Sequence, residues 1–306
     1  MYSHENIFYL INSIIKSFKF NRRDNQMTFL PFGHTASINY NIYPSLFLQN
    51  NLFISKGFDL ISLKFFTVLK KYKITYTQIV PTVLLVLNKL NLKKIKLPRL
   101  KFIGCGSSTL PLSSQQFFMK KYSIKISNLY GLSETGPTHF DDVFKKNWKP
   151  GSIGIPLEVN KVNIKKKEIY IKGRNVFIGY FKNLNLYKKI VKNGWFKSGD
   201  LGYKKDNIYY YLDRSKDLII KGGINIYPSE VEDVLYRLDF VDECAVIPIK
   251  NDILGEDVGV VIKIKKKYKN KNKDKLIDTL TKHCKKFISN YKIPTKIMFK
   301  NFLVKT

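Results

Sequence analysis

The chain has 306 residues, of which 44% are hydrophobic and 14% aromatic. This length allows two domains, and the composition excludes a disordered tail or a small disulfide-held protein. Lys and Arg number 54 against 23 Asp and Glu, a formal net charge of +31 that by itself suggests a polyanionic partner. Only six of these basic residues are Arg, although phosphate recognition favours Arg over Lys. We therefore expect Lys residues scattered over solvated faces and no nucleic-acid partner.

The cysteines and the apolar segments predict a soluble, cytoplasmic protein. Cys105, Cys244 and Cys284 are odd in number and widely separated, which predicts neither a disulfide framework nor a zinc site. The first residues lack the pattern of a signal peptide. Apolar runs such as Ile79–Leu87 are too short to cross a bilayer, so we expect no membrane span.

The first half of the chain alternates predicted helices and strands. Apolar residues recur every three or four positions from Asn6 to Phe20, which predicts an amphipathic helix. The pattern then predicts, in order, a strand at 27–30, a helix at 58–72 with Asp59 as its N-cap, a strand at 75–80, a helix at 81–92 and a strand at 100–103. Such alternation is typical of a layered α/β domain with a mostly parallel sheet, in which ligands gather at the carboxyl ends of the strands.

From residue 150 the pattern changes. Short alternating segments between Gly and Asn turns predict antiparallel, β-barrel-like structure over 150–213. The rest predicts a strand at 218–221, a helix at 229–238, strands at 243–249 and 258–264, a solvated Lys-rich loop at 263–275 and a helix at 275–288. The predicted fold class is thus α/β: a partial layered α/β domain over 1–213 that includes the β-barrel-like subdomain, and a small α+β domain over 214–306.

Three segments carry side chains suited to binding a nucleotide. Gly104–Pro111 is a Gly/Ser loop that leaves a strand, and Gly lets the backbone approach a ligand closely. Asn128–Gly136 combines an aromatic ring, a hydroxyl and a carboxylate, which offer a stacking plane, a phosphate contact and a Mg²⁺ ligand. Gly194–Gly202 sets Asp200 between glycines at the end of a strand, where it can accept the hydroxyls of a ribose. Taken singly, each segment is also compatible with an ordinary turn.

A fourth segment, Asp213–Glu232, reads DRSKDLIIKGGINIYPSEVE. In this order the four segments resemble the adenylate-forming (AMP-binding) superfamily, to which acyl-CoA synthetases belong. Pro31–His34 resembles the aromatic/His segment of that family, Gly151–Pro156 its GSvG.P turn, and Ile169–Tyr180 its strand pair ending in Gly-Tyr. The resemblance covers nearly the whole chain.

The resemblance implies a site for ATP and AMP with Mg²⁺. Glu134 would hold the metal, Ser133 would contact phosphate, and both would count among the catalytic residues. Asp200 would accept the ribose hydroxyls with Arg214 donating beside it, and the ring of Tyr130 would bracket adenine. The nucleotide-binding residues so implied are Gly106, Ser107, Ser108, Tyr130, Gly131, Ser133, Asp200 and Arg214.

The resemblance also implies a thiol site. His34 would sit near the acyl carboxylate and the thiol tunnel, and Lys216 matches the hinge about which the small domain turns between two half-reactions. Gly222 and Gly223 would line the tunnel with backbone. The thiol would belong to coenzyme A or to the phosphopantetheine arm of an acyl carrier protein.

These features predict an ATP-dependent acid–thiol ligase that is truncated at both ends. No Gly-rich loop ending in Pro-Lys-Gly precedes the first motif, and Phe302–Thr306 resembles only the approach to the closing Gly-Lys pair, with Lys305 as the basic residue before it. We therefore expect impaired adenylation in this chain alone, with the thiol step better preserved. The alternatives are a non-catalytic fragment, one subunit of a split ligase that pairs with a separate N-terminal fragment, and a basic nucleic-acid-binding protein.

The sequence leaves the acid open. No acid-binding Arg lies near Phe32, Thr82 or Gly104, and Thr138–Phe140 offers no decisive polar anchor. This favours a fatty or aromatic acid over a dicarboxylate or an amino acid. The choice between coenzyme A and a carrier protein also stays open.

Overall fold

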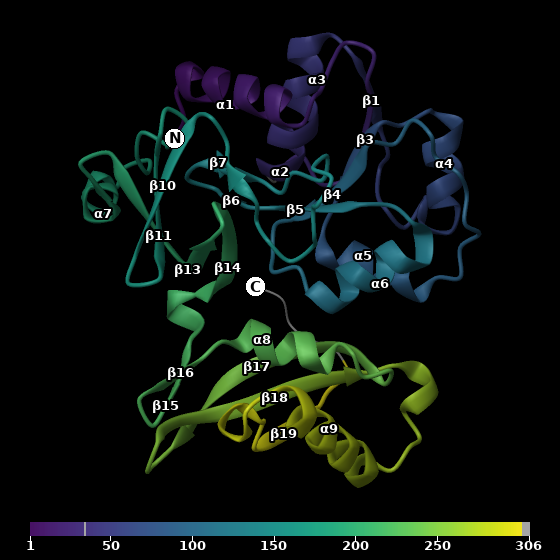
Figure 1. The fold of residues 1–306 in the computed structure, drawn as a ribbon, viewed down its shortest axis with the longest axis vertical. Helices are drawn as coiled ribbons and strands as arrows, with labels where there is room; N and C mark the ends of the chain where they lie inside the picture. The colour runs from purple at the N-terminus through teal and green to yellow at the C-terminus, as the bar shows by residue number, and fades with distance from the viewer. Residues whose placement is uncertain (34, 302–306) are drawn as a thin grey trace. The chain divides into compact units, whose positions relative to one another are not determined.

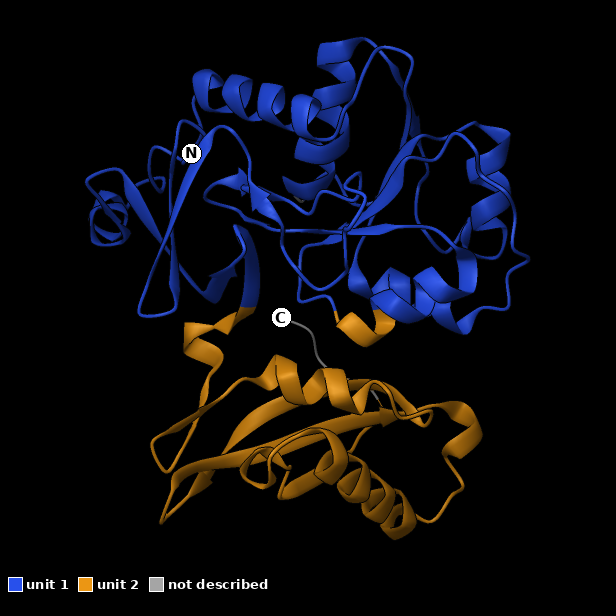
Figure 2. Ribbon diagram, viewed as in Figure 1, with its two compact units in different colours: residues 1–110, 115–211 blue, residues 111–114, 212–306 orange. Residues whose placement is uncertain are grey.

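The computed structural model describes residues 1–33 and 35–301. The chain divides into two compact units, shown in Figure 2. Unit 1 comprises residues 1–110 and 115–211, and unit 2 comprises residues 111–114 and 212–306. The division at residue 212 lies next to the domain limit expected from the sequence.

Unit 1 is built on a five-stranded parallel sheet (Figure 1). Its strands are β1 (Asn25–Thr28), β2 (Asn51–Ile54), β3 (Tyr76–Ile79), β4 (Phe102–Gly106) and β5 (Ile126–Leu129), in the order β2-β1-β3-β4-β5. Each neighbouring pair is parallel. This arrangement confirms the predicted α/β class.

Helices cover both faces of this sheet. On one face, side chains such as Met27, Phe65 and Ile103 form an apolar core with α4 (Phe65–Lys71), α5 (Pro81–Lys89) and α6 (Leu112–Tyr122). On the other face, Leu10 and Ile14 pack with aromatic rings of the sheet. The elements there are α1 (His4–Ser17), α2 (Thr35–Ser37), the π-helix η1 (Ile38–Ile42) and α3 (Tyr43–Leu48).

The helix predicted over 58–72 forms only in its second half. Phe58 and Ile61 accept backbone hydrogen bonds three residues ahead, and a short 3₁₀ helix, η2 (Ser62–Lys64), precedes α4. The N-cap of α4 is therefore Lys64, and the predicted cap at Asp59 is wrong. The apolar residues before Phe65 hold turns instead of a helix, although their spacing suits either structure.

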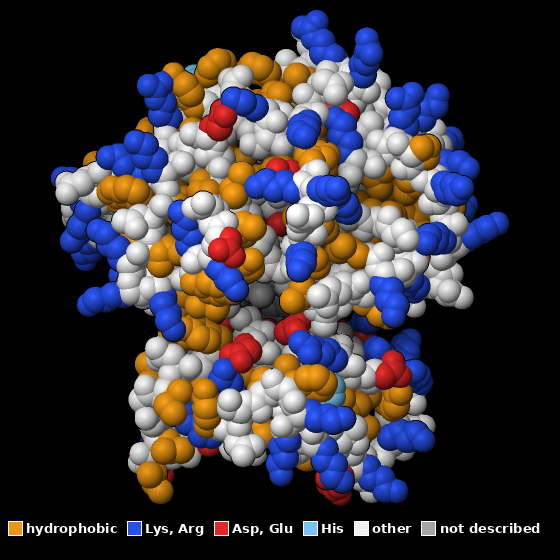
Figure 3. All heavy atoms as spheres, in the orientation of Figure 1, with side chains coloured by type: hydrophobic (Ala, Val, Ile, Leu, Met, Phe, Trp, Pro, Cys, Tyr) orange, Lys and Arg blue, Asp and Glu red, His pale blue; other side chains and the backbone are white. Residues whose placement is uncertain are grey.

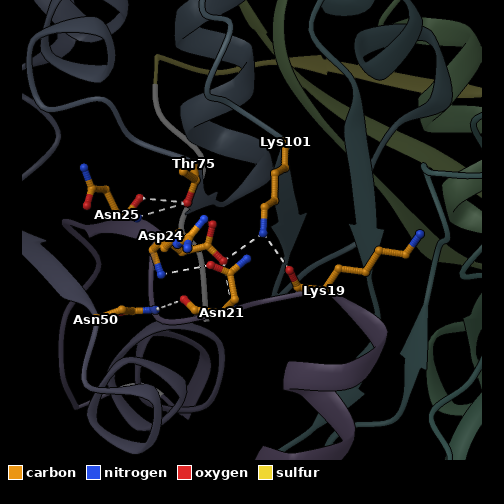
Figure 4. Close-up of polar contacts among 8 residues, drawn as sticks. Lys19, Asn21, Asp24, Asn25, Asn50, Thr75 and Lys101 are labelled. Carbon is orange, nitrogen blue, oxygen red and sulfur yellow. Dashed lines mark hydrogen bonds and ion pairs between the residues drawn. The ribbon is translucent and has the colours of Figure 1, made fainter.

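Partnered polar groups close the amino end of the sheet, as Figure 4 shows. Asp24 is buried, and its carboxylate accepts from Lys101 Nζ at 2.8 Å and from the Asn21 backbone at 2.8 Å. Lys101 Nζ also donates to the Lys19 carbonyl. The backbone of Asn25 at the start of β1 donates to Thr75 Oγ1 just before β3. The amino end of the sheet is thus occupied by the protein's own ion pair.

The rest of unit 1 is antiparallel. Two short hairpins, β6 (Gly131–Leu132) with β7 (Gly136–Pro137) and β8 (His139–Phe140) with β9 (Ile155–Pro156), lead into a five-stranded sheet. That sheet contains β10 (Asn160–Lys165), β11 (Glu168–Gly173), β12 (Val191–Lys192), β13 (Trp195–Lys205) and β14 (Ile208–Arg214), with α7 (Leu184–Ile190) inserted before β12. The predicted antiparallel region after residue 150 is confirmed.

Unit 2 is a small α+β structure with an apolar core. Its sheet contains β15 (Ile219–Lys221), β16 (Ile224–Ile226), β17 (Val241–Asn251), β18 (Gly255–Ile264) and β19 (Lys296–Phe299). The helices α8 (Pro228–Leu235) and α9 (Lys273–Phe287) contribute Val231, Leu235 and Leu280 to the core. Short 3₁₀ helices lie at Ser215–Asp217 (η3), Lys266–Tyr268 (η4) and Asn290–Lys292 (η5).

The Lys-rich segment predicted as a loop over 263–275 is more ordered than expected. Lys263 lies in β18 and forms ion pairs with Asp242 and Glu243. Lys265 and Lys267 both pair with Asp239. On the face drawn in Figure 3, Lys and Arg side chains are dispersed among uncharged ones. No helix among the described residues is long and apolar enough to cross a membrane.

Candidate functional site

The structure brings Tyr130 and Asp200 together, although seventy positions separate them in the sequence. Tyr130 directly follows β5, and its hydroxyl donates to Asp200 Oδ2 at 2.7 Å. Both side chains are buried. Burial and the neighbouring Asp200 charge raise the pKa of Tyr130, so its hydroxyl stays protonated and donates. This hydrogen bond connects the side chain expected at the adenine with the one expected at the ribose.

A bulge in β13 presents Asp200. The sequence predicted Asp200 at the end of a strand, but it lies within β13. The register with β11 shifts at this point: Glu168 pairs with Leu201, whereas Tyr170 pairs with Lys197, so β13 carries extra residues between them. Gly199 adopts a φ of 75°, which a side chain disfavours. Such bulges redirect a side chain out of the strand pattern, which explains the glycine before Asp200.

Two tyrosines that the sequence did not single out hold the Ser133–Glu134 segment. Tyr180 Oη donates to Glu134 Oε1 at 2.7 Å, and Tyr2 Oη donates to the Ser133 carbonyl at 2.7 Å. Burial, with the Glu134 charge contributing, raises the pKa of both phenols. Ser133 is exposed and Glu134 half-buried, at the tip of the β6–β7 hairpin. The Gly-Tyr pair ending in Tyr180 was the only sequence signal for this contact.

The Gly/Ser loop after β4 has an unusual backbone at Ser107. Ser107 has a φ of 77° and is exposed, as is Ser108. A left-handed conformation at a residue other than Gly is strained and is common at functional sites. Packing alone explains why residue 106 is a glycine, because a Cβ there would lie 2.5 Å from the Leu129 carbonyl oxygen. The close approach of β4 and β5 therefore accounts for this glycine.

His139 is a second residue that the sequence did not assign to the site. It is fully buried in β8, and its ring packs edge-on against Tyr130 and Tyr209. Burial lowers the pKa of His139 to about 3, so the ring is neutral. Thr138 Oγ1 lies 3.0 Å from its Nδ1, whereas its Nε2 has no hydrogen-bond partner. His139 thus supports the buried side of the Tyr130 ring.

Gly131 begins β6 in unit 1 and is exposed. The other predicted residues lie in unit 2 or outside the described residues. Arg214 ends β14 and Lys216 lies in η3, both with exposed side chains. Gly222 and Gly223 form the tight turn between β15 and β16, with φ of 55° and 80°. These values fit a type I′ hairpin turn, which requires positive φ at both positions, so the turn by itself explains both glycines. His34 lies outside the residues that the structure describes.

The carboxylate of Glu134 fits a magnesium ion that arrives with a phosphate. No group of three or more His, Cys, Asp or Glu side chains able to hold a metal occurs in residues 1–33 and 35–301. Mg²⁺ commonly binds through one or two carboxylates together with substrate phosphates and water, and not through an all-protein cage. A single half-buried carboxylate beside the exposed Ser133 meets that requirement.

Comparison with known families matches both parts of the chain. Residues 1–181 match the profile of the family described as AMP-binding enzyme. Residues 230–306 match the profile described as AMP-binding enzyme C-terminal domain.

Individual relatives agree with these matches. A long-chain-fatty-acid–CoA ligase of Bacillus subtilis (strain 168) is 31% identical over 290 residues, which cover 90% of this chain and 50% of the relative. The o-succinylbenzoate CoA synthetase of Bacillus subtilis, solved with its acyl-adenylate intermediate, is 25% identical with a TM-score of 0.87 and covers 100% of this chain and 63% of that one. The same synthetase solved with ATP and magnesium gives 25% identity, a TM-score of 0.86, and coverage of 99% and 63%. The chain spans about half the length of the curated ligase that it matches.

Proposed function

Because this chain belongs to the AMP-binding enzyme family, we propose that it is an AMP-forming acid–thiol ligase, or the part of one that binds the nucleotide and the thiol. In the first half-reaction a carboxylate oxygen attacks the α-phosphorus of ATP, and pyrophosphate leaves. In the second, a thiol of coenzyme A or of a carrier-bound phosphopantetheine attacks the acyl carbonyl, and AMP leaves. The named relative that acts on long-chain fatty acids supports a role in fatty acid metabolism. The three unpaired, buried cysteines favour the cytoplasm.

The nucleotide would be held in unit 1. Asp200 accepts the ribose hydroxyls, and the Tyr130 hydroxyl fixes the orientation of that carboxylate through the 2.7 Å hydrogen bond. The backbone of Gly106–Ser108 and the Tyr130–Gly131 segment flank the adenine. The strained φ at Ser107 supports this assignment, because it presents the loop backbone at the carboxyl end of β4.

The phosphates would meet the β6–β7 hairpin. Ser133 donates to a phosphate oxygen, and Glu134 binds the magnesium ion, which neutralises charge on the departing pyrophosphate when it is bound. Tyr180 and Tyr2 act as positioning residues, because each bonds to this segment and not to the reacting atoms.

Unit 2 would serve the thiol step. We assign Lys216 as the hinge, Arg214 as a donor to the ribose, and Gly222 and Gly223 as backbone beside the pantetheine arm. His34 is assigned to the acyl carboxylate. These assignments rest on the motif resemblance and the family match.

The observation that carries the proposal is the buried Tyr130–Asp200 hydrogen bond, and calorimetry with AMP tests it. Asp200→Asn loses a charge-assisted acceptor and should weaken AMP binding about 10- to 100-fold. Tyr130→Phe frees the carboxylate and should weaken binding about tenfold. The matched control Asp206→Asn changes an exposed Asp in the β13–β14 turn and should leave binding unchanged.

A second assay follows the thiol step. The chain is mixed with a synthetic acyl-adenylate and coenzyme A, and the thioester is measured with and without Asp200→Asn. The proposal expects thioester formation that depends on Asp200. Absence of AMP binding in the wild type, or equal binding in all the variants, contradicts it.

A further inference from the structure

A layer of polar side chains lies buried on one face of the parallel sheet in unit 1. Side chains alternate along a strand, so Gln26 and Thr28 of β1 share a face, as do Tyr76 and Gln78 of β3. The register pairs Gln26 with Tyr76, which places both strands' polar residues on the same face. Asn41 belongs to η1, which packs against these two strands, and its Nδ2 donates to Gln26 Oε1 at 3.2 Å. We call these five residues the polar layer.

Every member of the polar layer has an unpartnered atom. The five residues are at most 1% exposed. The atoms without a hydrogen-bond partner are Gln26 Nε2, Thr28 Oγ1, Asn41 Oδ1, Tyr76 Oη and both Gln78 Oε1 and Nε2. Nearly all buried polar groups in proteins are hydrogen-bonded, because leaving one unbonded costs its full desolvation energy. Such a cluster needs a hydrogen-bond partner that the protein itself does not supply, either ordered water or a bound ligand.

The position of the layer suits a ligand attached to the nucleotide. Gln78 pairs with Gly104, and Gly106 lies two residues further along β4, about 7 Å away. Gly104 has no side chain on this face, and the side chains of Leu129 and Tyr76 approach it closely: a Cβ there would lie 2.6 Å from Leu129 Cδ1 and 2.7 Å from Tyr76 Oη. Gln78 thus lies one strand repeat from the loop proposed to hold adenine, and Gln78 and Thr28 lie near the carboxyl ends of β3 and β1. Gln26 and Tyr76 lie nearer the amino ends of the same strands.

The element that covers the layer is unusual as well. The π-helix η1 packs against β1 and β3 and carries Asn41. π-helices are rare and are frequently found at functional sites. Aromatic rings of Tyr40 and Phe102 flank the layer, so a few polar groups lie in an otherwise apolar surround. That combination is typical of small-molecule sites.

We propose that the polar layer recognises the acyl group of the acid, and that this acid carries a neutral hydrogen-bonding group, such as a hydroxyl, on its chain or ring. The inference rests on the proposed function and names the substrate class of the same site. The unpartnered atoms belong to amides and hydroxyls, which can pair with a hydroxyl but cannot neutralise a second carboxylate. The acid can still be fatty or aromatic, as the sequence favours. Gln78 is the main specificity-determining residue, because both ends of its amide are unpartnered.

Calorimetry with stable acyl-adenylate mimics tests this proposal. The probes are sulfamoyl adenosine without an acyl group, its octanoyl and ω-hydroxyoctanoyl derivatives, and its benzoyl and para-hydroxybenzoyl derivatives. In at least one pair the hydroxylated probe should bind the wild type about tenfold more tightly, the ratio expected of one hydrogen bond to a buried partner. Gln78→Met conserves volume, removes the amide and should bring that ratio to about one. Gln116→Met, on the exposed face of α6, is the matched control and should keep the wild-type ratio.

The outcomes separate this proposal from the proposed function. Failure of every probe, including the one without an acyl group, overturns the proposed function and this inference with it. Binding of the unacylated probe with no hydroxyl preference in either pair overturns the polar-layer proposal alone. A lower melting temperature of ligand-free Gln78→Met with an unchanged binding ratio also overturns it, because the layer would then hold structural water.

Discussion

The two units differ in how they treat buried polar atoms. Among the described residues, thirteen buried side-chain oxygen and nitrogen atoms lack a hydrogen-bond partner, and all thirteen lie in unit 1. Unit 2 has buried carboxylates too, but they are satisfied: Asp213 accepts from the Ser229 backbone at 2.9 Å, and Asp257 pairs with Lys221. Its core is built from apolar side chains and two cysteines. Burial of a polar group therefore does not by itself mark a site, whereas a cluster of unpartnered groups marks a place that needs ordered water or a ligand.

The contrast also holds within unit 1. At the amino end of the parallel sheet, Asp24 and Lys101 satisfy each other, whereas Thr28 and Gln78 near the carboxyl ends are unpartnered. Unit 1 can bury charge when partners are provided. The following variants remove or add buried polar groups or their partners, and each experiment measures the change in the free energy of unfolding.

The largest effect should come from breaking the ion pair between the buried Asp24 and the partly buried Lys101. Lys101→Met leaves Asp24 buried without its cation, and we expect the free energy of unfolding of unit 1 to fall by about 3 to 4 kcal/mol. Urea unfolding measures this loss. Lys70→Met, at an exposed position on α4, is the control and should change stability by less than about 0.5 kcal/mol. Equal stability of the two variants would show that the pair contributes nothing.

A pH effect should come next. Burial raises the pKa of Asp141 to about 6, although Trp148 Nε1, Ser152 Oγ and the Asn128 backbone donate to it. As pH rises, the Asp141 carboxyl loses its proton in the unfolded state before it does so in the folded state. Its ionisation therefore lowers the free energy of unfolding at pH values above the ordinary pKa of Asp. Relative to Asp141→Asn, the wild type should lose about 2 to 3 kcal/mol as pH rises from about 4 to above 6. Unfolding followed by tryptophan fluorescence at several pH values measures this, and a flat difference contradicts it.

The next largest effect should come from placing a hydroxyl without a hydrogen-bond partner in the core of unit 2. Val260 is fully buried in β18, and Val260→Thr keeps its shape while adding a hydroxyl to an apolar core. We expect unit 2 to lose about 2 kcal/mol in the free energy of unfolding. Val260→Ala provides the comparison for lost packing without a polar atom. If Val260→Thr retains wild-type stability, the apolar composition of this core is not what distinguishes the units.

The smallest effect should be the reverse change in unit 1. Gln78→Met replaces an unpartnered amide with an apolar chain of similar volume, so the ligand-free protein should gain about 1 kcal/mol. Thermal unfolding measures the gain, with Gln116→Met as the control. A loss of stability would place Gln78 among the structural residues.

The sequence predicted the motifs of the site but not their contacts. Tyr130, Glu134 and Asp200 stand in recognisable segments, yet their partners lie far away in the chain: Tyr130 with Asp200, and Glu134 with Tyr180. No local pattern encodes such pairs, because they follow from how strands of different sheets are placed. The sequence likewise did not predict the bulge before Asp200, because Gly199 is the only residue there that indicates one.

The sequence pattern did not predict the polar layer, for a related reason. Gln78 lies within a run that correctly predicted a strand, and a single amide does not disturb that pattern. The helical segment that carries Asn41 was not predicted, because polar residues at buried positions such as Asn39 and Asn41 interrupt the apolar period. The lack of partners for these atoms is a property of the folded state alone.

A crystal structure of this chain with para-hydroxybenzoyl or ω-hydroxyoctanoyl sulfamoyl adenosine, whichever binds more tightly, tests the central claim most directly. The account predicts ribose oxygens on Asp200, and the acyl hydroxyl within hydrogen-bond distance of the Gln78 amide. Ordered water bridging Gln26, Thr28 and Gln78, with the acyl group bound elsewhere, would contradict it.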